Sequence, residues 1–261
     1  MLRYITSILL AALSIALLTT APASATNSDI AKEQRWAEQV VDGLLDGDAA
    51  WLLDDIGHEF LGIITEGEAR SERAVILVHG IGVHPNWPDV IYPLREGLLA
   101  QGITSLSIQM PILENDADPR EYGLLFDEVP GRIDAALEYL DDRGYRDIVI
   151  VAHSMGASMA SHYLARAQSG AISSVVLIGM GPGINGTENI ASLAKISVPV
   201  LDLYGGQDLE QVLASAADRD AAGKKIGAGN YLQVRVAGAN HFFQGHEAEL
   251  VRQVTDWLEA R

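Results

Sequence analysis

The serine at position 154 has the sequence environment of a nucleophile. It follows the β-branched run 147–150, which predicts a buried strand, and precedes residues 157–167, which have helical character. The small residues Ala152 and Gly156 stand two positions to either side, as a sharp turn that exposes the hydroxyl requires. The start of the following helix would direct free N–H groups toward an anion formed there. An ordinary strand–helix turn capped by a serine is the other interpretation of this stretch taken alone.

An aspartate and a histidine that could activate this serine follow two later apolar runs. Residues 198–204 and 231–236 predict strands; Asp208 comes after the first and His241 after the second. We expect His241 to take the proton of Ser154 and to return it to the leaving group. Asp208 would hold the imidazole in the required tautomer and stabilise its cation.

The alternatives for these two roles are weaker. Asp202 is the competing acid, but it lies inside the predicted strand, where its carboxylate would be buried or face the sheet. His241 could be an ordinary loop histidine. However, the chain order serine, aspartate, histidine, with each residue just past a strand end, makes chance a poor explanation. Open α/β sheets place their ligand crevice at this edge.

A glycine-flanked loop follows the apolar run 74–78 and predicts a site for a developing negative charge. The loop 79–82 would bring a backbone N–H close to the substrate. We expect the backbone N–H groups of Ile81 and Met155 to be the two oxyanion donors. His79 is interpreted as a structural imidazole that ties the loop to its neighbours, and not as the catalytic base.

Loops at the same edge could shape a substrate pocket. Trp87, Phe242 and Phe243 are expected to line an apolar acyl site, although core packing would explain one or two of them equally well. The connections 115–130 and 180–186 could border the crevice, or they could be ordinary loops. Neither is long enough for a large cap, so we expect an accessible site for an ester or a similar acyl substrate.

The sequence predicts no metal and no cofactor. The pairs His79 and His84, and His241 and His246, lack the carboxylate or thiolate pattern of a known metal motif. No glycine-rich phosphate-binding motif is present. His153 precedes the predicted nucleophile, should point the other way on the turn, and is interpreted as structural.

Three segments resemble the α/β-hydrolase superfamily, and the resemblance extends over nearly all of the chain after residue 25. They are residues 77–82, 152–156 and 239–243. The second is similar to a nucleophile elbow, with Ala152 in place of the usual first glycine. The resemblance implies the α/β-hydrolase fold and a triad of Ser154, His241 and Asp208.

The chain more closely resembles a little-characterised family of exported proteobacterial hydrolase-like proteins. Residues 83–88, 108–111 and 201–205 carry this resemblance. It implies no particular substrate, and the α/β-hydrolase superfamily also contains members without catalytic activity.

The segments that hold these residues alternate between strand-like and helix-like patterns. This alternation predicts one α/β domain over residues 26–261, with a mainly parallel central sheet, helices on both faces and a minimal cap. Strands are expected at 59–65 (antiparallel), 74–78, 104–110, 147–150, 173–179, 198–204 and 231–236, and helices at 30–45, 90–99, 133–140, 157–167 and 252–258.

Residues 1–25 have the features of a cleaved secretory signal. Arg3 precedes the apolar run 5–18, and Ala23-Ser24-Ala25 forms a small-residue cleavage box. A membrane helix is the alternative, but the run is short and polar residues follow it. The absence of cysteine excludes disulfides and a lipoprotein anchor. We expect a periplasmic protein, with secretion to the medium as the second choice.

The formal net charge of −17 limits the partners. Such a surface repels nucleic acid and anionic lipid, and it disfavours highly anionic substrates. The sequence therefore predicts an exported serine hydrolase that acts on a small-molecule ester or related acyl bond through an acyl-enzyme at Ser154. Amide, thioester or glycan-ester cleavage stays open. The alternative from another class is a non-catalytic binding or envelope-assembly protein with this fold.

Overall fold

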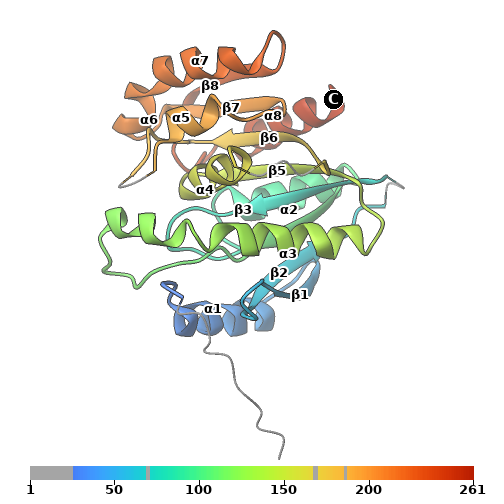
Figure 1. Cartoon of the computed structure of the whole chain (residues 1–261). Helices are drawn as coiled ribbons and strands as arrows, with labels where there is room; N and C mark the ends of the chain where they lie inside the picture. Colours follow the sequence, from blue (N-terminus) through green and yellow to red (C-terminus); the bar gives the residue numbers. More distant parts are fainter. Residues whose placement is uncertain (1–25, 69–70, 167–169, 185–186) are drawn as a thin grey trace, which may run out of the picture.

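The structure, a computed structural model, describes residues 26–68, 71–166, 170–184 and 187–261. The expected secretory signal lies outside the described residues. An eight-stranded sheet runs through the molecule in the order β1-β2-β4-β3-β5-β6-β7-β8 (Figure 1). No helix in these ranges combines the length and apolar character needed to cross a membrane.

The sheet is mainly parallel, as the sequence predicts. β2 pairs antiparallel with both β1 and β4, and all the other neighbouring pairs are parallel. The sequence analysis missed β1, which lies at the edge of the sheet. The strands are β1 (Asp48–Leu53), β2 (Glu59–Thr65), β3 (Arg73–Val78), β4 (Thr104–Ile108), β5 (Asp147–His153), β6 (Ile172–Ile178), β7 (Val200–Gln207) and β8 (Tyr231–Asn240).

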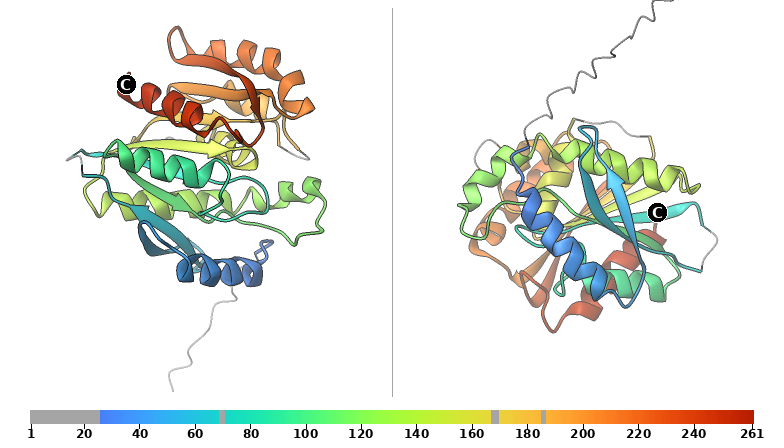
Figure 2. Two further views of the ribbon diagram at one scale, coloured as in Figure 1. Left: turned by 180° about the vertical axis from the view of Figure 1, so that it is seen from behind. Right: turned by 90° about the horizontal axis from the view of Figure 1, so that it is seen from below.

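Helices cover both faces of the sheet, which confirms the predicted fold class (Figure 2). α2 packs with α8 on one face, whereas α3, α4, α5 and α7 lie on the other, and α1 packs on β2. The helices are α1 (Ile30–Asp42), α2 (Ile91–Ala100), α3 (Val129–Asp141), α4 (Met155–Leu164), α5 (Asn189–Leu193), α6 (Glu210–Ala214), α7 (Ala216–Gly223) and α8 (Glu247–Glu259), with 3₁₀ turns η1 (Pro119–Leu125) and η2 (Lys224–Ile226).

The central strands supply two separate apolar cores because successive side chains point to opposite faces. In β3, Ile76 and Val78 join the core under α3 and α4, whereas Val75 and Leu77 join the core under α2 and α8. All four side chains are fully buried. This two-sided burial explains why the central strands have continuous apolar sequences.

The strand order predicts a ligand crevice at the carboxyl edge of β3 and β5. From β3 the chain crosses to β4 on one side, whereas from β5 it crosses to β6 on the other. Loops that leave in opposite directions open a crevice between them. Val78 pairs with Ala152, so the loop after β3 begins beside the turn that carries Ser154.

Candidate active site

The turn after β5 holds Ser154 in an unusual backbone conformation. Its φ of 56° and ψ of −116° lie outside the regions that non-glycine residues ordinarily adopt. Its N–H donates to the carbonyl oxygen of Ile178 at 2.7 Å, which fixes the turn against β6. Gly156 is required because an added Cβ would lie 2.3 Å from the carbonyl oxygen of His79. Such a backbone costs about 1–3 kcal/mol and persists only where the surroundings enforce it.

Asp208 and His241 reach the same edge through the register of β7 and β8. Gln207 pairs with Asn240, so Asp208 and His241 are the next residues on two neighbouring strands. Both are buried, with 6% and 5% of their surface exposed. Their proximity follows from parallel pairing, because parallel strands end at the same edge.

Ser154, His241 and Asp208 form one hydrogen-bonded chain. Nε2 of His241 lies 2.9 Å from Oγ of Ser154, and Nδ1 lies 2.6 Å from Oδ1 of Asp208. A carboxylate only accepts, so Nδ1 must carry the proton that bonds to Asp208. Nε2 is then the ring nitrogen left to accept the serine proton.

Asp208 is held as an anion. Burial has the largest single effect and raises the pKa of its carboxyl, but the hydrogen bond and charge of His241, together with two backbone hydrogen bonds, outweigh it. The N–H groups of Gly205, at 3.1 Å, and Leu209, at 2.8 Å, also donate to the carboxylate. The pKa of Asp208 therefore lies below its ordinary value, and the carboxylate stays charged at neutral pH.

Asp202 has a different role from Asp208. It is fully buried in β7 and pairs with Nε of Arg219 at 2.8 Å. The hydroxyl of Tyr231 and the amide of Gln233 also donate to it, each at 2.8 Å. This network joins β7, β8 and α7, so Asp202 is a structural anion, as its mid-strand position indicates.

His153 forms a hydrogen bond with the backbone of His241 and packs against its ring. Its Nε2–H donates to the carbonyl oxygen of His241 at 3.0 Å, and the two ring centroids are 4.9 Å apart. Burial, with a smaller contribution from the charge of His241, lowers the pKa of His153 to about 3. His153 is therefore neutral at pH 7 and fixes the backbone of the neighbouring histidine.

His79 ties the loop after β3 to the end of β4. Its Nδ1–H donates to the carbonyl oxygen of Gly80 at 2.8 Å, and its Nε2 accepts the N–H of Met110 at 2.9 Å. An added Cβ on Gly80 would lie 3.4 Å from Cβ of Ser154, so the loop backs onto the turn. The interpretation of His79 as a structural imidazole agrees with these contacts.

The two N–H groups expected to stabilise an oxyanion border this region. Met155 begins α4 and lines a cavity with Ser154, and Ile81 follows Gly80 in the loop that backs onto the turn. In the described part of the chain, neither N–H donates to a protein acceptor. Met155 lies in the wall of the cavity, whereas Ile81 is not one of its lining residues.

The cavity beside Ser154 has a volume of about 90 Å³. Its wall includes residues 181–184 of the connection 180–186, which the sequence analysis singled out, and part of the segment after β7, which it did not. Residues 185–186 of that connection lie outside the described residues. Gly179 has a φ of 61°, and an added Cβ would lie 3.0 Å from the His241 ring. The lining residues are Ser154, Met155, Ser158, Gly179, Gly181, Pro182, Gly183, Ile184, Asn189, Leu209, Gln211, Val212 and His241.

Sequence reasoning missed Asn189, which is buried against this cavity. Its Nδ2 donates to Oγ of Ser158 at 2.7 Å and to the carbonyl oxygen of Gly181 at 3.0 Å. These bonds hold the connection after β6 against α4. A lone asparagine in a polar stretch carries no local signal of such a role.

The three aromatic residues expected to line the pocket lie in different environments. Phe242 is 41% exposed and contacts the His241 ring edge-on at 5.1 Å, so it lies beside the site. The prediction is wrong for Phe243, which is fully buried in the core under α2 and α8. Trp87 does not line the cavity and stacks on Trp36 with ring centroids 6.3 Å apart.

No metal site accompanies these residues within the described ranges, where no three His, Asp or Glu side chains gather closely enough to hold an ion. The candidate site consists of the serine, histidine and aspartate, a small cavity beside the serine, and Met155 at the wall of that cavity.

Two buried histidines, His79 and His153, and the half-buried His84 should make the folded state sensitive to acid. Burial lowers the pKa of His79 and His153 to about 3 and that of His84 to about 4. Each would have a pKa near 6.5 when unfolded, so below about pH 6.5 the unfolded chain binds protons that the folded chain does not. The contribution of these neutral histidines to the free energy of unfolding is fully present above that pH. As the pH drops toward 4, the free energy of unfolding should fall by about 1.4 kcal/mol per pH unit for each histidine.

Urea unfolding at several values between pH 7.5 and 4.5 measures this loss. His84→Phe keeps a ring against Trp36 but removes one titrating group. The dependence of the unfolding free energy on pH should then correspond to one proton fewer taken up on unfolding. A free energy of unfolding that stays constant over this range would contradict the prediction.

Comparison with known families identifies the chain's relatives. The model of a family described as a protein of unknown function (DUF3530) matches residues 3–124 and 125–260. The chain belongs to this family. No curated protein matches its sequence.

Several solved structures with the same architecture are described as esterases or α/β serine hydrolases. An α/β serine hydrolase homologue from Coxiella burnetii is 20% identical, with a TM-score of 0.64, and the match covers 82% of this chain and 99% of that one. The esterase Pf2001 of Pyrococcus furiosus is 15% identical, with a TM-score of 0.66 and coverages of 85% and 95%. XC6422 from Xanthomonas campestris, described as an α/β serine hydrolase without lid, is 16% identical, with a TM-score of 0.61 and coverages of 83% and 95%. The chain thus has the α/β-hydrolase fold.

Proposed function

We propose that this protein is an exported serine hydrolase that cleaves an ester or a related acyl bond through an acyl-enzyme at Ser154. The observation that carries the proposal is the continuous hydrogen-bonded chain from Ser154 through His241 to Asp208. Similarity to solved esterases and serine hydrolases supports it at the level of the fold.

The geometry suits a two-step acyl transfer. Oγ of Ser154 attacks the acyl carbon while Nε2 of His241 takes the hydroxyl proton, and Asp208 stabilises the resulting imidazolium. Collapse of the tetrahedral intermediate breaks the bond to the leaving group, which receives that proton from His241. A water molecule then attacks the acyl-enzyme, gives its proton to His241, and releases the acid and the free serine.

The negative charge of the tetrahedral intermediate would be stabilised by the N–H groups of Ile81 and Met155. A donor of this kind contributes about 2.7–4 kcal/mol to the transition state. Because the contacts of His79 hold the loop and the helix start holds Met155, both donors would be in place before the substrate arrives.

The size of the cavity favours a small acyl group. Its volume of about 90 Å³ equals that of roughly three water molecules in the liquid. We expect p-nitrophenyl acetate and butyrate to be hydrolysed with a kcat/KM about tenfold or more above that of the laurate, because a laurate chain is longer than this cavity and would leave it at Pro182, Gly183 and Ile184, which also line a neighbouring pocket of about 690 Å³.

An ester panel of graded acyl length below the micelle concentration measures this preference. Val212→Ala, which enlarges the cavity wall, should shift the optimum toward longer chains. A preference of the unaltered protein for laurate would show that the acyl group binds elsewhere.

Export is part of the proposal. The cleavage box at Ala23-Ser24-Ala25 and the resemblance to exported hydrolase-like proteins support a periplasmic location, with the medium as second choice. The charge of −17 favours neutral small-molecule substrates over nucleic acids and anionic lipids.

Covalent labelling tests the reaction class. A fluorophosphonate probe should label the protein, and peptide mass spectrometry should locate the adduct on Ser154. A well-folded protein that neither reacts with the probe nor hydrolyses any ester would instead be a non-catalytic binding or envelope-assembly protein.

A further inference from the structure

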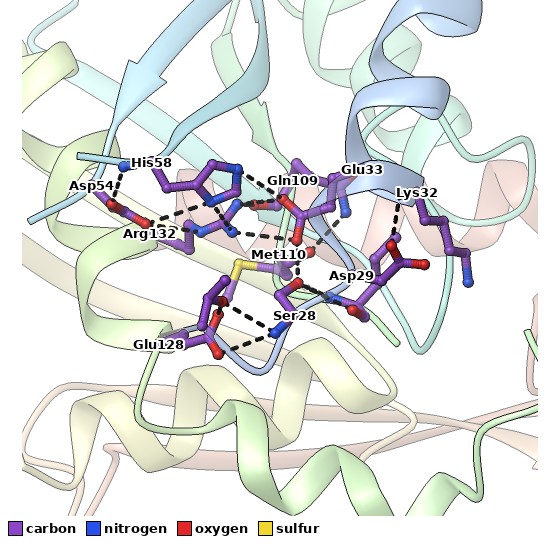
Figure 3. Close-up of polar contacts among 12 residues, drawn as sticks. Ser28, Asp29, Lys32, Glu33, Asp54, His58, Gln109, Met110, Glu128 and Arg132 are labelled. Atoms are coloured by element: carbon purple, nitrogen blue, oxygen red, sulfur yellow. Dashed lines mark hydrogen bonds and ion pairs between the residues drawn. The ribbon is translucent and has the colours of Figure 1, made fainter. Parts of the chain in front are cut away.

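The first described residues make a dense set of contacts with Glu128, which directly precedes α3. Oε1 of Glu128 accepts the backbone N–H of Asn27 at 2.6 Å and that of Ser28 at 3.3 Å. Oε2 accepts the hydroxyl of Thr26. One carboxylate thus binds three consecutive residues that lie about a hundred positions away in the chain. Figure 3 shows Glu128 facing Ser28.

The same segment is anchored on its other side to the chain that follows β4. The buried hydroxyl of Ser28 accepts the N–H of Ile112 at 2.9 Å, and the N–H of Asp29 donates to the carbonyl oxygen of Ile112 at 2.7 Å. Lys32, in the first turn of α1, donates to the carbonyl oxygen of Leu113 at 2.6 Å. Residues 26–29 are therefore an integral part of the folded domain.

The charge of Glu128 is not neutralised by a neighbouring side chain. Arg132, one turn along α3, instead forms an ion pair with Glu33, with Nη1 and Oε2 3.0 Å apart, and its Nε lies 3.6 Å from Oδ2 of Asp54 (Figure 3). Its other amino group bonds to His58 at 2.9 Å. Across the described ranges, Glu128 forms no ion pair with a lysine, arginine or histidine.

We propose that Glu128 is the binding site for the α-ammonium group that cleavage after Ala25 creates on Thr26. Hydrolysis of the Ala25–Thr26 peptide bond adds water across it, leaving a carboxylate on Ala25 and an amine on Thr26 that is protonated at neutral pH. The nitrogen of Thr26 is three bonds from the hydroxyl oxygen that already contacts Glu128, and so within about 4 Å of that oxygen. Cleavage turns a neutral amide beside a carboxylate into a cation.

The ion pair would connect maturation to the candidate active site. Residues 26–29 hold Ile112 through the hydroxyl of Ser28. Ile112 lies two residues beyond Met110, and the N–H of Met110 donates to Nε2 of His79. His79 in turn holds Gly80 in the loop behind Ser154. The inference rests on the expected cleavage after Ala25 and does not depend on catalysis by Ser154.

The test uses the full chain, expressed with residues 1–25 in place and purified from the exported fraction. Intact mass should correspond to a chain that begins at Thr26. A variant with Gly-Ser inserted between Ala25 and Thr26 moves the new amino group away from Glu128 while leaving every described residue unchanged. Its Tm at pH 7 should be lower by about 2–4 °C.

The pH dependence of this Tm difference identifies the amino group. Pairing raises the folded pKa of the α-amino group above its unfolded value of about 7.7–8.0. The stabilisation is therefore complete below that value and lost as the pH rises through the folded pKa, so the Tm difference should fall below about 1 °C at pH 10.

The other charged groups around Glu128 do not produce this signal. They are Arg132 on α3, His58 and Asp54 at the β1–β2 turn, and Glu33 and Lys32 on α1. Each is present in both proteins, so its titration cancels in the comparison. In a Glu128→Gln background, the Gly-Ser insertion should change Tm by less than about 1 °C at pH 7. Glu138→Gln, on the exposed face of α3, is the control. In that background the insertion should lower Tm by the same amount as in the unaltered protein, about 2–4 °C.

Three results would overturn the proposal. They are an amino terminus other than Thr26, equal Tm values for the two proteins at pH 7, and a Tm difference that persists at pH 10 or in Glu128→Gln. Ester hydrolysis is not measured in any arm, so failure of the proposed enzymatic function would leave this outcome unaffected.

Discussion

Ser154→Ala should reduce kcat for p-nitrophenyl acetate by about 10⁶-fold. The variant lacks the only atom that can form the acyl-enzyme in the proposed mechanism, while His241 and Asp208 remain bonded to each other. Fluorophosphonate labelling should disappear as well. Initial rates at enzyme concentrations high enough to detect the residual activity measure the loss.

Ser158→Ala is the matched control. Ser158 lies one turn further along α4, lines the same cavity and accepts a hydrogen bond from Asn189. Because it does not contact His241, its loss should change kcat less than about tenfold. Undiminished turnover or labelling of Ser154→Ala would show that the nucleophile is another residue.

Asp208→Asn should reduce kcat by about 10⁴-fold while leaving the fold intact. The carboxylate now accepts Nδ1–H of His241 at 2.6 Å, which leaves Nε2 unprotonated beside Ser154. An amide can donate to Nδ1 and so favour the opposite tautomer, in which Nε2 carries the proton and cannot accept one from the serine. The negative charge that stabilises the imidazolium is lost at the same time.

Asp202→Asn provides the contrast, because it changes the other acid of β7 in the same way. It leaves the fully buried Arg219 without its anion, which should lower the free energy of unfolding by about 3–5 kcal/mol. The folded fraction should keep its kcat. Measurements of kcat at 20 °C and of urea unfolding separate the two variants. A large loss of kcat in Asp202→Asn with little loss in Asp208→Asn would assign the catalytic role to Asp202.

The central strands could be predicted because each is buried on both faces. β-Branched runs such as those of β3, β5 and β6 have few other stable environments in a chain of this size. β1 escaped detection because it is an edge strand in which exposed and buried residues alternate and an aspartate opens it. The short helices α5, α6 and α7 also escaped, because five to eight residues carry too little periodicity.

The aromatic residues show where local sequence is insufficient. Phe242 and Phe243 are adjacent, yet one lies beside His241 and the other is buried in the core. The backbone of Phe243, with a φ of 54°, directs its side chain inward at the turn after β8. No periodicity applies across such a turn, so the pattern of residues does not distinguish the two environments.

The sequence alone determined the fold class and the positions of Ser154, Asp208 and His241 just beyond strand ends, because parallel strands finish at one edge wherever they lie in the sheet. Only the tertiary structure decided that His241 bridges the other two at 2.9 and 2.6 Å, that the cavity beside Ser154 is small, and that Glu128 binds the first residues after Ala25. These features depend on the order and register of the strands and on contacts between residues about a hundred positions apart, which local patterns of residue type do not encode.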